Sequence, residues 1–400
     1  MCNKETIVGH PLSLKLLMLF FSYSFVLLLP FASALVPTTS PPVIEKRAQC
    51  QATLNNALIV ARRLQSHYFN AATGQYTGGS LWTDANTVED LHNLMLATGT
   101  DEFSTIGETS FIGRAALNSG TNWQNILGGS NDDAGWIVLA LWKIADYKAS
   151  RGKDNSAYLN SASKIYDIIS GQWDDAICGG GVWWSTAHTY KNAITNELYL
   201  LLSASGYLRN GNTNYLNNAK KTWAWLSKSG MRNSAGLYND GLTDSCQNNG
   251  QTTWTYNQGV IASGLAALSV ATGDKSLLTQ AEITLDATIA RLSTNNILRE
   301  SCDNAVGGGS VCNQDQQLFK GLWTKHLQYY LDMANDSART AKYASYLASQ
   351  TSAVFHFGTS ASNDVGSVWY APDQGGSIFT PKTSASGLAA HVAAAKYGTC

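Results

Sequence analysis

The chain has 400 residues, of which 44% are hydrophobic and 14% are charged, and its formal net charge is −1. This length and apolar content allow one large core or two smaller ones. A near-neutral chain lacks the basic surface that nucleic acid requires, so we expect no nucleic-acid partner.

The N-terminal segment has the character of an export and processing signal. An apolar run from Leu16 to Phe31 follows Lys15 and precedes small residues. This run is too short and wrongly flanked for a stable membrane span, which favours a cleaved signal peptide. The pair Lys46-Arg47 is either a processing site or a solvated surface pair. We predict three parts: a signal peptide (1–34), a pro-segment that ends in the dibasic site (35–47), and a single mature domain (48–400).

The C-terminal stretch from Leu388 to Cys400 is Ala-rich and contains His391 and Lys396. A GPI anchor signal needs an apolar tail, which this stretch lacks. We therefore expect a secreted protein that has no stable membrane anchor and acts outside the cell.

Cysteine usage agrees with export. Cys2 would leave with the signal peptide, and six cysteines remain: Cys50, Cys178, Cys246, Cys302, Cys312 and Cys400. An even number in an oxidising compartment predicts three disulfides, which could connect in 15 ways. We favour Cys302–Cys312, which closes a short loop, Cys178–Cys246, which links two long loops, and Cys50–Cys400, which joins the ends of the domain. A sequon at Asn335 predicts N-glycosylation.

Helical periodicity recurs from end to end, whereas strand signals are scarce. The pattern predicts twelve helices in six hairpins, at 52–68 and 84–98, 105–117 and 132–149, 154–170 and 190–206, 212–228 and 254–272, 275–293 and 314–333, and 337–356 and 384–397. Asp154 and Asn214 are expected N-caps, and Gly206, Gly230 and Gly273 are expected C-caps.

The second helix of each hairpin is the less polar one. Residues 134–142 and 259–267 are apolar or small nearly all round, whereas 215–221 are largely polar. A helix that is apolar all round is buried, and an amphipathic helix lies outside it. We therefore predict an all-α fold, an (α/α)6 barrel of six helical hairpins. An open helical solenoid would show the same periodicity, but Cys50 and Cys400 at the two ends favour closure.

The connections that lead into the inner helices are long and rich in Gly, Asn, Asp, Trp and Tyr. They cover about 69–83, 118–131, 171–189, 230–253, 294–313 and 357–383. In a barrel these loops gather at one end. Long loops of this kind are usually functional, so we expect the active site there.

Asp132 and Asp133 lie where a Gly-rich loop meets an inner helix. One interpretation is helix capping, because acidic residues accept backbone N–H bonds at a helix start. The other is catalysis of glycosyl transfer, in which a retaining enzyme holds a nucleophile and an acid/base about 5 Å apart. Neighbouring Cα atoms lie about 3.8 Å apart, so adjacent aspartates can reach that separation. The pair alone leaves both interpretations open.

Further candidates stand in the same loops. Trp183 and Trp184 follow a glycine run and either stack on sugar rings or pack into the barrel mouth, while Asp174-Asp175 reads as a solvated turn. The spacing of cysteines and histidines shows no metal-ligand pattern, and we expect no metal and no cofactor. Buried polar groups at the starts of inner helices need partners, and substrate is one possible partner. These groups are Asn196, Tyr256, Asn257 and Gln258. Asp240 stands in a predicted turn, from which its carboxylate could also reach a sugar hydroxyl.

Several strings occur in order along the chain. They are Asn131-Asp-Asp-Ala-Gly-Trp136, Gly179-Gly-Gly-Val-Trp-Trp-Ser185, Lys191-Asn-Ala-Ile-Thr-Asn-Glu197, Asp240-Gly241, Trp254-Thr-Tyr-Asn-Gln-Gly259, Leu298-Arg-Glu-Ser-Cys302, and Cys312 followed by Asp315 and Phe319-Lys-Gly321. As a set they resemble glycoside hydrolase family 76, the endo-α-1,6-mannanases and their fungal cell-wall relatives. The resemblance spans nearly the whole predicted mature domain.

The resemblance implies roles for individual residues. It implies Asp132 as the nucleophile and Asp133 as the acid/base of a retaining glycosidase. We expect ten residues to bind substrate: Asn131, Trp136, Trp183, Trp184, Asn196, Asp240, Tyr256, Asn257, Gln258 and Lys320.

The resemblance also supplies the substrate. We expect a secreted, monomeric hydrolase of α-1,6-linkages in mannan, released into the medium or the cell wall. One alternative is a transglycosylase that links mannan or GPI glycan to wall glucan. Another is a non-catalytic carbohydrate-binding wall protein, although such a protein has no need of two adjacent aspartates.

N-terminal sequencing of the secreted protein checks the predicted processing. The mature chain should begin near Ala48, and an intermediate should begin near Leu35. Mature protein that retains the pro-segment throughout would contradict this prediction.

Overall fold

Two concentric layers of helices build the part of the chain that the structure describes, a computed structural model of residues 49–304, 311–372 and 376–400. The outer helices are α1 (Gln51–His67), α4 (Phe111–Leu117), α7 (Ser156–Ser170), α9 (Thr213–Leu226), α11 (Ser276–Arg291) and α13 (Ser337–Ala353). The inner helices are α2 (Leu81–Thr98), α6 (Asn131–Ser150), α8 (Ala193–Asn210), α10 (Thr255–Thr272), α12 (Phe319–Ala334) and α14 (Pro381–Tyr397).

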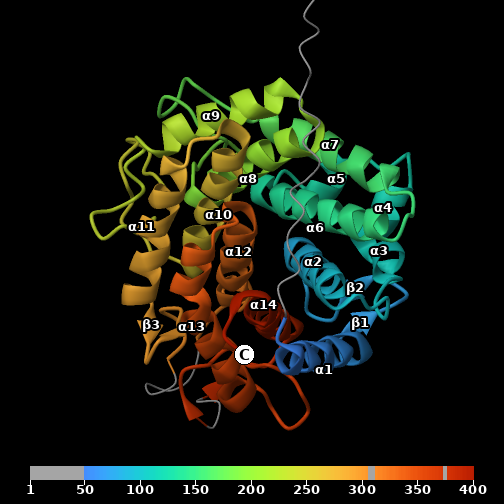
Figure 1. Ribbon diagram of the computed structural model, residues 1–400. Helices are drawn as coiled ribbons and strands as arrows, with labels where there is room; N and C mark the ends of the chain where they lie inside the picture. Colours follow the sequence, from blue (N-terminus) through green and yellow to red (C-terminus); the bar gives the residue numbers. More distant parts are fainter. Residues whose placement is uncertain (1–48, 305–310, 373–375) are drawn as a thin grey trace, which may run out of the picture. The chain divides into compact units, whose positions relative to one another are not determined.

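The inner helices form a closed ring, which Figure 1 shows with the outer helices around it. Each packs on the next in the order α2, α6, α8, α10, α12 and α14, and α14 packs back on α2. The predicted (α/α)6 barrel is therefore confirmed, and the open solenoid is wrong. All described residues belong to one compact unit, Val43–Cys400. The predicted signal peptide, pro-segment and mature start at Ala48 lie outside the described residues.

The two layers follow from sequence patterning. In α10 every residue from Thr255 to Ser269 is buried, and from Gly259 onward the side chains are small or apolar on all faces. In α9 only one stripe is buried, including Tyr215, Ala219 and Trp225, and the remaining face is polar. The outer helices bury such stripes against the inner ring, and this removal of apolar surface from water stabilises the barrel. None of the described helices is long and apolar enough to cross a bilayer.

Several expected boundaries differ from the observed ones. The helix predicted at 105–117 is interrupted at Ser110, which caps α4, so that α3 (Ile106–Thr109) stands apart. The helix predicted from 384 begins at Pro381, because proline is tolerated in the first turn and Thr380 forms a capping box. The helix predicted from 314 begins at Phe319.

The expected caps are correct only in part. Gly273 ends α10 in the left-handed conformation, as predicted. Gly206 does not end α8, which continues to Asn210. A Cβ at position 206 would come within 2.3 Å of the Tyr215 ring, so this glycine serves close packing. The observed N-caps are Asn155 and Asn212, not Asp154 and Asn214, and α9 ends before Gly230.

Small elements fill the long connections, which precede the inner helices. They are the hairpins β1 (Phe69–Asn70) with β2 (Gln75–Tyr76) and β3 (Ser293–Thr294) with β4 (Ile297–Leu298), the short helix α5 (Trp123–Leu127) and the π-helix η1 (Val354–Gly358). Disulfides join Cys50 to Cys400, Cys178 to Cys246, and Cys302 to Cys312, which are the three favoured pairs. Asn335 is exposed at the end of α12, and its glycosylation stays a prediction.

A buried ionic network crosses the barrel from α12 to α2. The ammonium of Lys325, which is fully buried, contacts Asn86 at 2.9 Å, Glu89 at 2.8 Å and Asp90 at 3.0 Å. The hydroxyl of Tyr329 donates to Glu89 at 2.7 Å. These two helices are separated in the ring by α14, whose small side chains leave room for the network. Part of the barrel interior is thus occupied by paired charges.

Removal of the buried cation should destabilise the barrel strongly. In Lys325→Met two buried carboxylates lose their partner, which should lower the free energy of unfolding by about 3–5 kcal/mol. Arg62→Met is the control, because it removes an ion pair with Glu102 whose side chains are 57% and 36% exposed. Urea unfolding should find the control almost unchanged. Equal losses in both variants would contradict a stabilising role for the network.

Candidate active site

Asp132 and Asp133 occupy the first turn of α6. The N-cap of this helix is Ser130, whose hydroxyl oxygen accepts from the Asp133 backbone N–H at 3.4 Å. The same hydroxyl donates to the Asp132 carboxylate at 2.8 Å. Because serine provides the cap, neither aspartate side chain is needed for it. Both side chains are only partly buried and remain available for chemistry.

The loop between α7 and α8 is fixed against the start of α6. The Asn131 backbone N–H donates to the Trp184 carbonyl at 2.9 Å, and the Asn131 side chain donates to the Trp183 carbonyl at 2.7 Å. The Thr186 N–H donates to the Gly129 carbonyl at 2.9 Å. Asn131, expected to bind substrate, therefore has its amide engaged in joining this loop to the helix.

The two aspartates have unequal electrostatic surroundings. Burial raises the pKa of Asp132, while hydrogen bonds from the side chains of Ser130 and Trp184 favour its ionised form and act against that rise. Burial also raises the pKa of Asp133 to about 7, with further contributions from the negative charges of Asp132 and Asp315. Asp133 thus keeps its proton to higher pH than an ordinary aspartate, beside a partner whose anion is hydrogen-bonded.

Further acidic groups come to the same end of the barrel. Asp240, half-buried, accepts a hydrogen bond from the Tyr190 hydroxyl at 2.5 Å, and burial raises its pKa. Asp315 accepts from the Trp82 indole at 3.0 Å. Burial raises the pKa of Asp84 to about 7, and Lys382 acts against this rise. Sequence reasoning assigned no role to Asp84 or Lys382, although both stand at starts of inner helices.

The adjacent tryptophans differ sharply in exposure. Trp183 is 7% exposed, stacks on His188 with ring centres 5.3 Å apart, and has the Lys191 ammonium 4.6 Å from its ring centre. Packing into the loop therefore takes up most of its surface. Trp184 is 43% exposed, and its side chain contacts Asp132. Of the two, Trp184 is the one whose ring can lie against a sugar.

Several other candidates have their polar atoms engaged in the protein. The amide of Asn196 bonds to the Val182 N–H at 2.7 Å and to the Val182 and Asn192 carbonyls. The Gln258 amide bonds to the Tyr238 backbone on both sides. The Lys320 ammonium contacts Asp303 and the Ser367 carbonyl. These side chains hold the loops of the site in place, and their polar atoms are engaged in doing so.

The remaining candidates have different environments. Trp136 is 1% exposed and packs between Trp82 and His326 in the barrel. Tyr256 is stacked on Phe319 with ring centres 3.9 Å apart. Asn257 is fully buried, and within the described residues neither of its amide atoms has a hydrogen-bond partner. The same holds for the Glu197 carboxyl group, whose pKa burial raises well above its ordinary value.

One group of potential metal ligands occurs among the described residues, namely Cys302, Asp303 and Cys312. The two cysteines are bonded to each other, and Asp303 contacts Lys320. A disulfide supplies no thiolate, so this group fits a structural role.

Curated relatives come from fungi. The chain is 25% identical over 338 residues to a putative mannan endo-1,6-alpha-mannosidase of Schizosaccharomyces pombe, covering 80% of this chain and 74% of the relative. It is 26% identical over 219 residues to the mannan endo-1,6-alpha-mannosidase DFG5 of Candida albicans, covering 52% of this chain and 48% of that relative. The match to the Candida protein thus spans about half its length.

Solved structures share the fold. One is an inactive variant of the α-1,6-mannanase GH76A of a Salegentibacter species, in complex with α-1,6-mannotriose. It matches with a TM-score of 0.72 and 19% identity, over 86% of this chain and 99% of that one. Dfg5 from Chaetomium thermophilum, in complex with glucosamine, matches with a TM-score of 0.72 and 16% identity, over 88% and 92%.

The family is decided by the sequence profile of Glycosyl hydrolase family 76, which matches residues 53–396. This range covers all twelve helices of the two layers except the ends of α1 and α14. The chain belongs to glycosyl hydrolase family 76.

Proposed function

We propose that this protein is a retaining glycoside hydrolase that cleaves α-1,6-mannosidic linkages in mannan, with Asp132 as nucleophile and Asp133 as acid/base. The observation that carries the proposal is the pair of adjacent carboxylates with unequal surroundings at the loop end of the barrel. Membership of a glycosidase family supports the reaction class. The proposed substrate is inferred from the names of the fungal relatives and from the mannotriose complex of a structural neighbour.

The proposed assignment of roles follows the local hydrogen bonds. A nucleophile must be ionised before attack, and Ser130 and Trp184 favour the Asp132 anion. An acid must hold its proton near neutral pH, and a pKa of about 7 allows Asp133 to do so. In the structural neighbour from Salegentibacter, two consecutive aspartates are replaced by asparagine in a variant described as inactive. This parallel supports the importance of such a pair.

The proposed reaction has two steps. The Asp132 carboxylate attacks the anomeric carbon while Asp133 donates its proton to the leaving oxygen, which gives a glycosyl-enzyme ester. Asp133, now ionised, takes a proton from the incoming water, which attacks the same carbon and releases Asp132. Two inversions leave the product with the α-configuration. The exposed Trp184 beside Asp132 offers an aromatic face to an adjoining sugar ring.

A second candidate function shares the first step. A transglycosylase would pass the glycosyl group from Asp132 to a sugar hydroxyl, with water excluded. The structure of Chaetomium Dfg5 in complex with glucosamine supports keeping this candidate, because the sugar in that complex is not mannose. Product analysis with and without an acceptor sugar separates the two, since a transferase forms a new linkage only when the acceptor is present.

The raised pKa of Asp133 can be measured directly. Carbon NMR titration of the Asp133 carboxyl should give a pKa of about 7. In Asp132→Asn this pKa should fall, because a neighbouring negative charge is lost, yet stay above the ordinary value of 3.8, because burial remains. Asp315→Asn should produce a smaller fall. An unchanged Asp133 pKa in Asp132→Asn would contradict the proposed coupling.

The same pKa predicts the pH dependence of turnover. Protonated Asp133 is the active acid, so kcat/KM on mannan should decline as the pH rises through about 7. A substrate with an activated leaving group needs little protonation in the first step. For that substrate, kcat/KM should not decline as the pH rises through about 7. The comparison uses one enzyme preparation and two substrates over the same pH range.

Replacement of each aspartate should have distinct kinetic effects. Asp132→Asn should abolish turnover of every substrate, because nothing replaces the nucleophile. Asp133→Asn should be far milder on activated substrates, and azide should restore its second step. Each change also removes a negative charge from the first turn of α6, where it complements the helix dipole, at a cost of up to about 1 kcal/mol. Unfolding midpoints are therefore measured alongside the rates.

Proton NMR of the first products tests the retaining mechanism. The released mannose should initially be the α-anomer. Initial β-mannose would mean inversion by a water held between the carboxylates, and Asp132 would then not be a nucleophile.

A further inference from the structure

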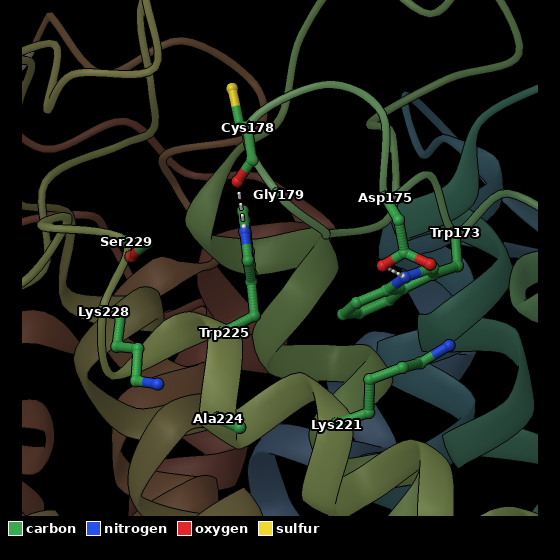
Figure 2. A pocket seen from close by; sticks show the side chains of 9 residues that line it. All are labelled: Trp173, Asp175, Cys178, Gly179, Lys221, Ala224, Trp225, Lys228 and Ser229. Carbon is green, nitrogen blue, oxygen red and sulfur yellow. Dashed lines mark hydrogen bonds between the residues drawn. The ribbon is translucent and has the colours of Figure 1, made fainter.

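A pocket of about 370 Å³ lies outside the ring of inner helices, between α9 and the loop that joins α7 to α8. Figure 2 shows Cys178 and Gly179 of this loop above it and Lys221 and Ala224 of α9 below it. Its volume falls in the lower part of the range for ligand pockets. Neither catalytic aspartate lines it.

Two tryptophans form a corner in this pocket. The rings of Trp173 and Trp225 lie 6.2 Å apart at an angle of 74° (Figure 2). Both indole N–H groups are used within the protein, since Trp173 donates to Asp175 at 2.6 Å and Trp225 donates to the Cys178 carbonyl at 2.9 Å. Trp225 is 8% exposed and closes one side of the corner, whereas the Trp173 ring is partly exposed and supplies the apolar surface that a ligand can reach. That surface needs no further polar partner. Such surfaces suit the C–H faces of a sugar ring.

Charged groups surround this corner. The Lys221 ammonium lies 4.1 Å from the Trp173 ring centre, and Asp175 and Lys228 are exposed at the pocket lining. Positively charged donors and a negatively charged acceptor beside an aromatic surface suit a neutral ligand with many hydroxyl groups. A lipid would leave these charges without partners, and a simple anion would meet the Asp175 carboxylate.

The pocket is built rigidly. The buried Lys191 ammonium donates to the carbonyls of Asp174, Ile177 and Gly180 at 2.7, 2.6 and 2.8 Å, which clamps the loop from within. The Cys178–Cys246 disulfide ties the loop to the connection before α10. A ligand would therefore enter a preformed site, and its binding would cost little conformational entropy of the loop.

The pocket and the active site are connected through one loop. Trp173 pairs with Val182 in an antiparallel bridge, and Trp184, which contacts Asp132, follows two residues later. Two residues of chain span at most about 7 Å. Both sites thus lie on the loop end of the barrel, within reach of a single oligosaccharide.

We propose that this pocket is a second carbohydrate-binding site, which holds a sugar residue of the mannan chain away from the cleaved linkage. The identity of the sugar rests on the proposed function. Occupancy at a second point raises the effective concentration of the polymer at the active site. The pocket therefore acts on long chains and leaves short substrates unaffected.

Binding is tested first, in Asp132→Asn protein so that the ligand is not consumed. The indole N–H signal of Trp173 is identified by its loss in Trp173→Phe and followed by NMR during titration with α-1,6-mannohexaose. The signal should shift to saturation. Ala224→Gln, which places a longer side chain in the pocket, should abolish the shift, whereas Asn217→Gln, exposed on the same helix outside the pocket, should not.

Kinetics in the otherwise unchanged enzyme form the second test. Ala224→Gln should raise KM for polymeric mannan at least about threefold and leave kcat/KM for mannotriose unchanged, while Asn217→Gln alters neither. An unmoved Trp173 signal, or equal KM values for both variants on polymer, would overturn the second site. If wild-type enzyme cleaves no mannan but the Trp173 signal shifts, the proposed function fails and the pocket assignment stands.

Discussion

The hydrogen bonds between the start of α6 and the loop from residue 171 to 192 are the contacts on which the rest of the site depends. Asn131 orients this loop by donating hydrogen bonds to the Trp183 and Trp184 carbonyls. The Lys191 ammonium donates to three carbonyls of the same loop and holds them together. One face of the loop thereby brings Trp184 to Asp132, and the other face forms the pocket with α9. The same backbone therefore positions both the proposed catalytic pair and the proposed second sugar site.

Charged groups inside the barrel and at its loop end have different surroundings. Inside the ring, Lys325 has carboxylate partners on α2, and the network contributes stability. At the loop end, Asp84, Asp132, Asp133 and Asp240 have raised pKa values because burial there is not fully matched by cations. The parallel inner helices direct their N-terminal dipoles toward this end, which offsets part of the repulsion among the acidic groups. Because this compensation is incomplete, burial and the neighbouring carboxylates still raise the pKa of Asp133 to about 7.

Sequence reasoning predicted the fold because burial all round a helix and burial along one stripe leave different patterns. It also located the Asp132-Asp133 pair, since the pair lies at a loop-to-helix junction. It could not tell a sugar-binding amide from one that bonds to a nearby backbone. Asn196 and Gln258 carry amide groups of the kind that bind sugar hydroxyls. In the structure these amides bond instead to the backbone at Val182 and Tyr238. The charge of Asp315 raises the pKa of Asp133. Sequence alone could not predict this effect, because the two residues are far apart along the chain and meet only in the folded barrel.

Hydrolysis and transfer differ only in what approaches the glycosyl-enzyme once the leaving group has gone. A site that binds sugar at a second point retains an acceptor chain near Asp132 through the interval in which water would otherwise react. With Trp184 exposed beside Asp132 and the Trp173–Trp225 corner behind the same loop, the chain can remain attached after the first step. High effective concentration of a hydroxyl group then competes with water, whose concentration is fixed. Under the proposed mechanism, the balance between the two reactions is therefore set by how long the acceptor stays bound, and the same two aspartates serve both.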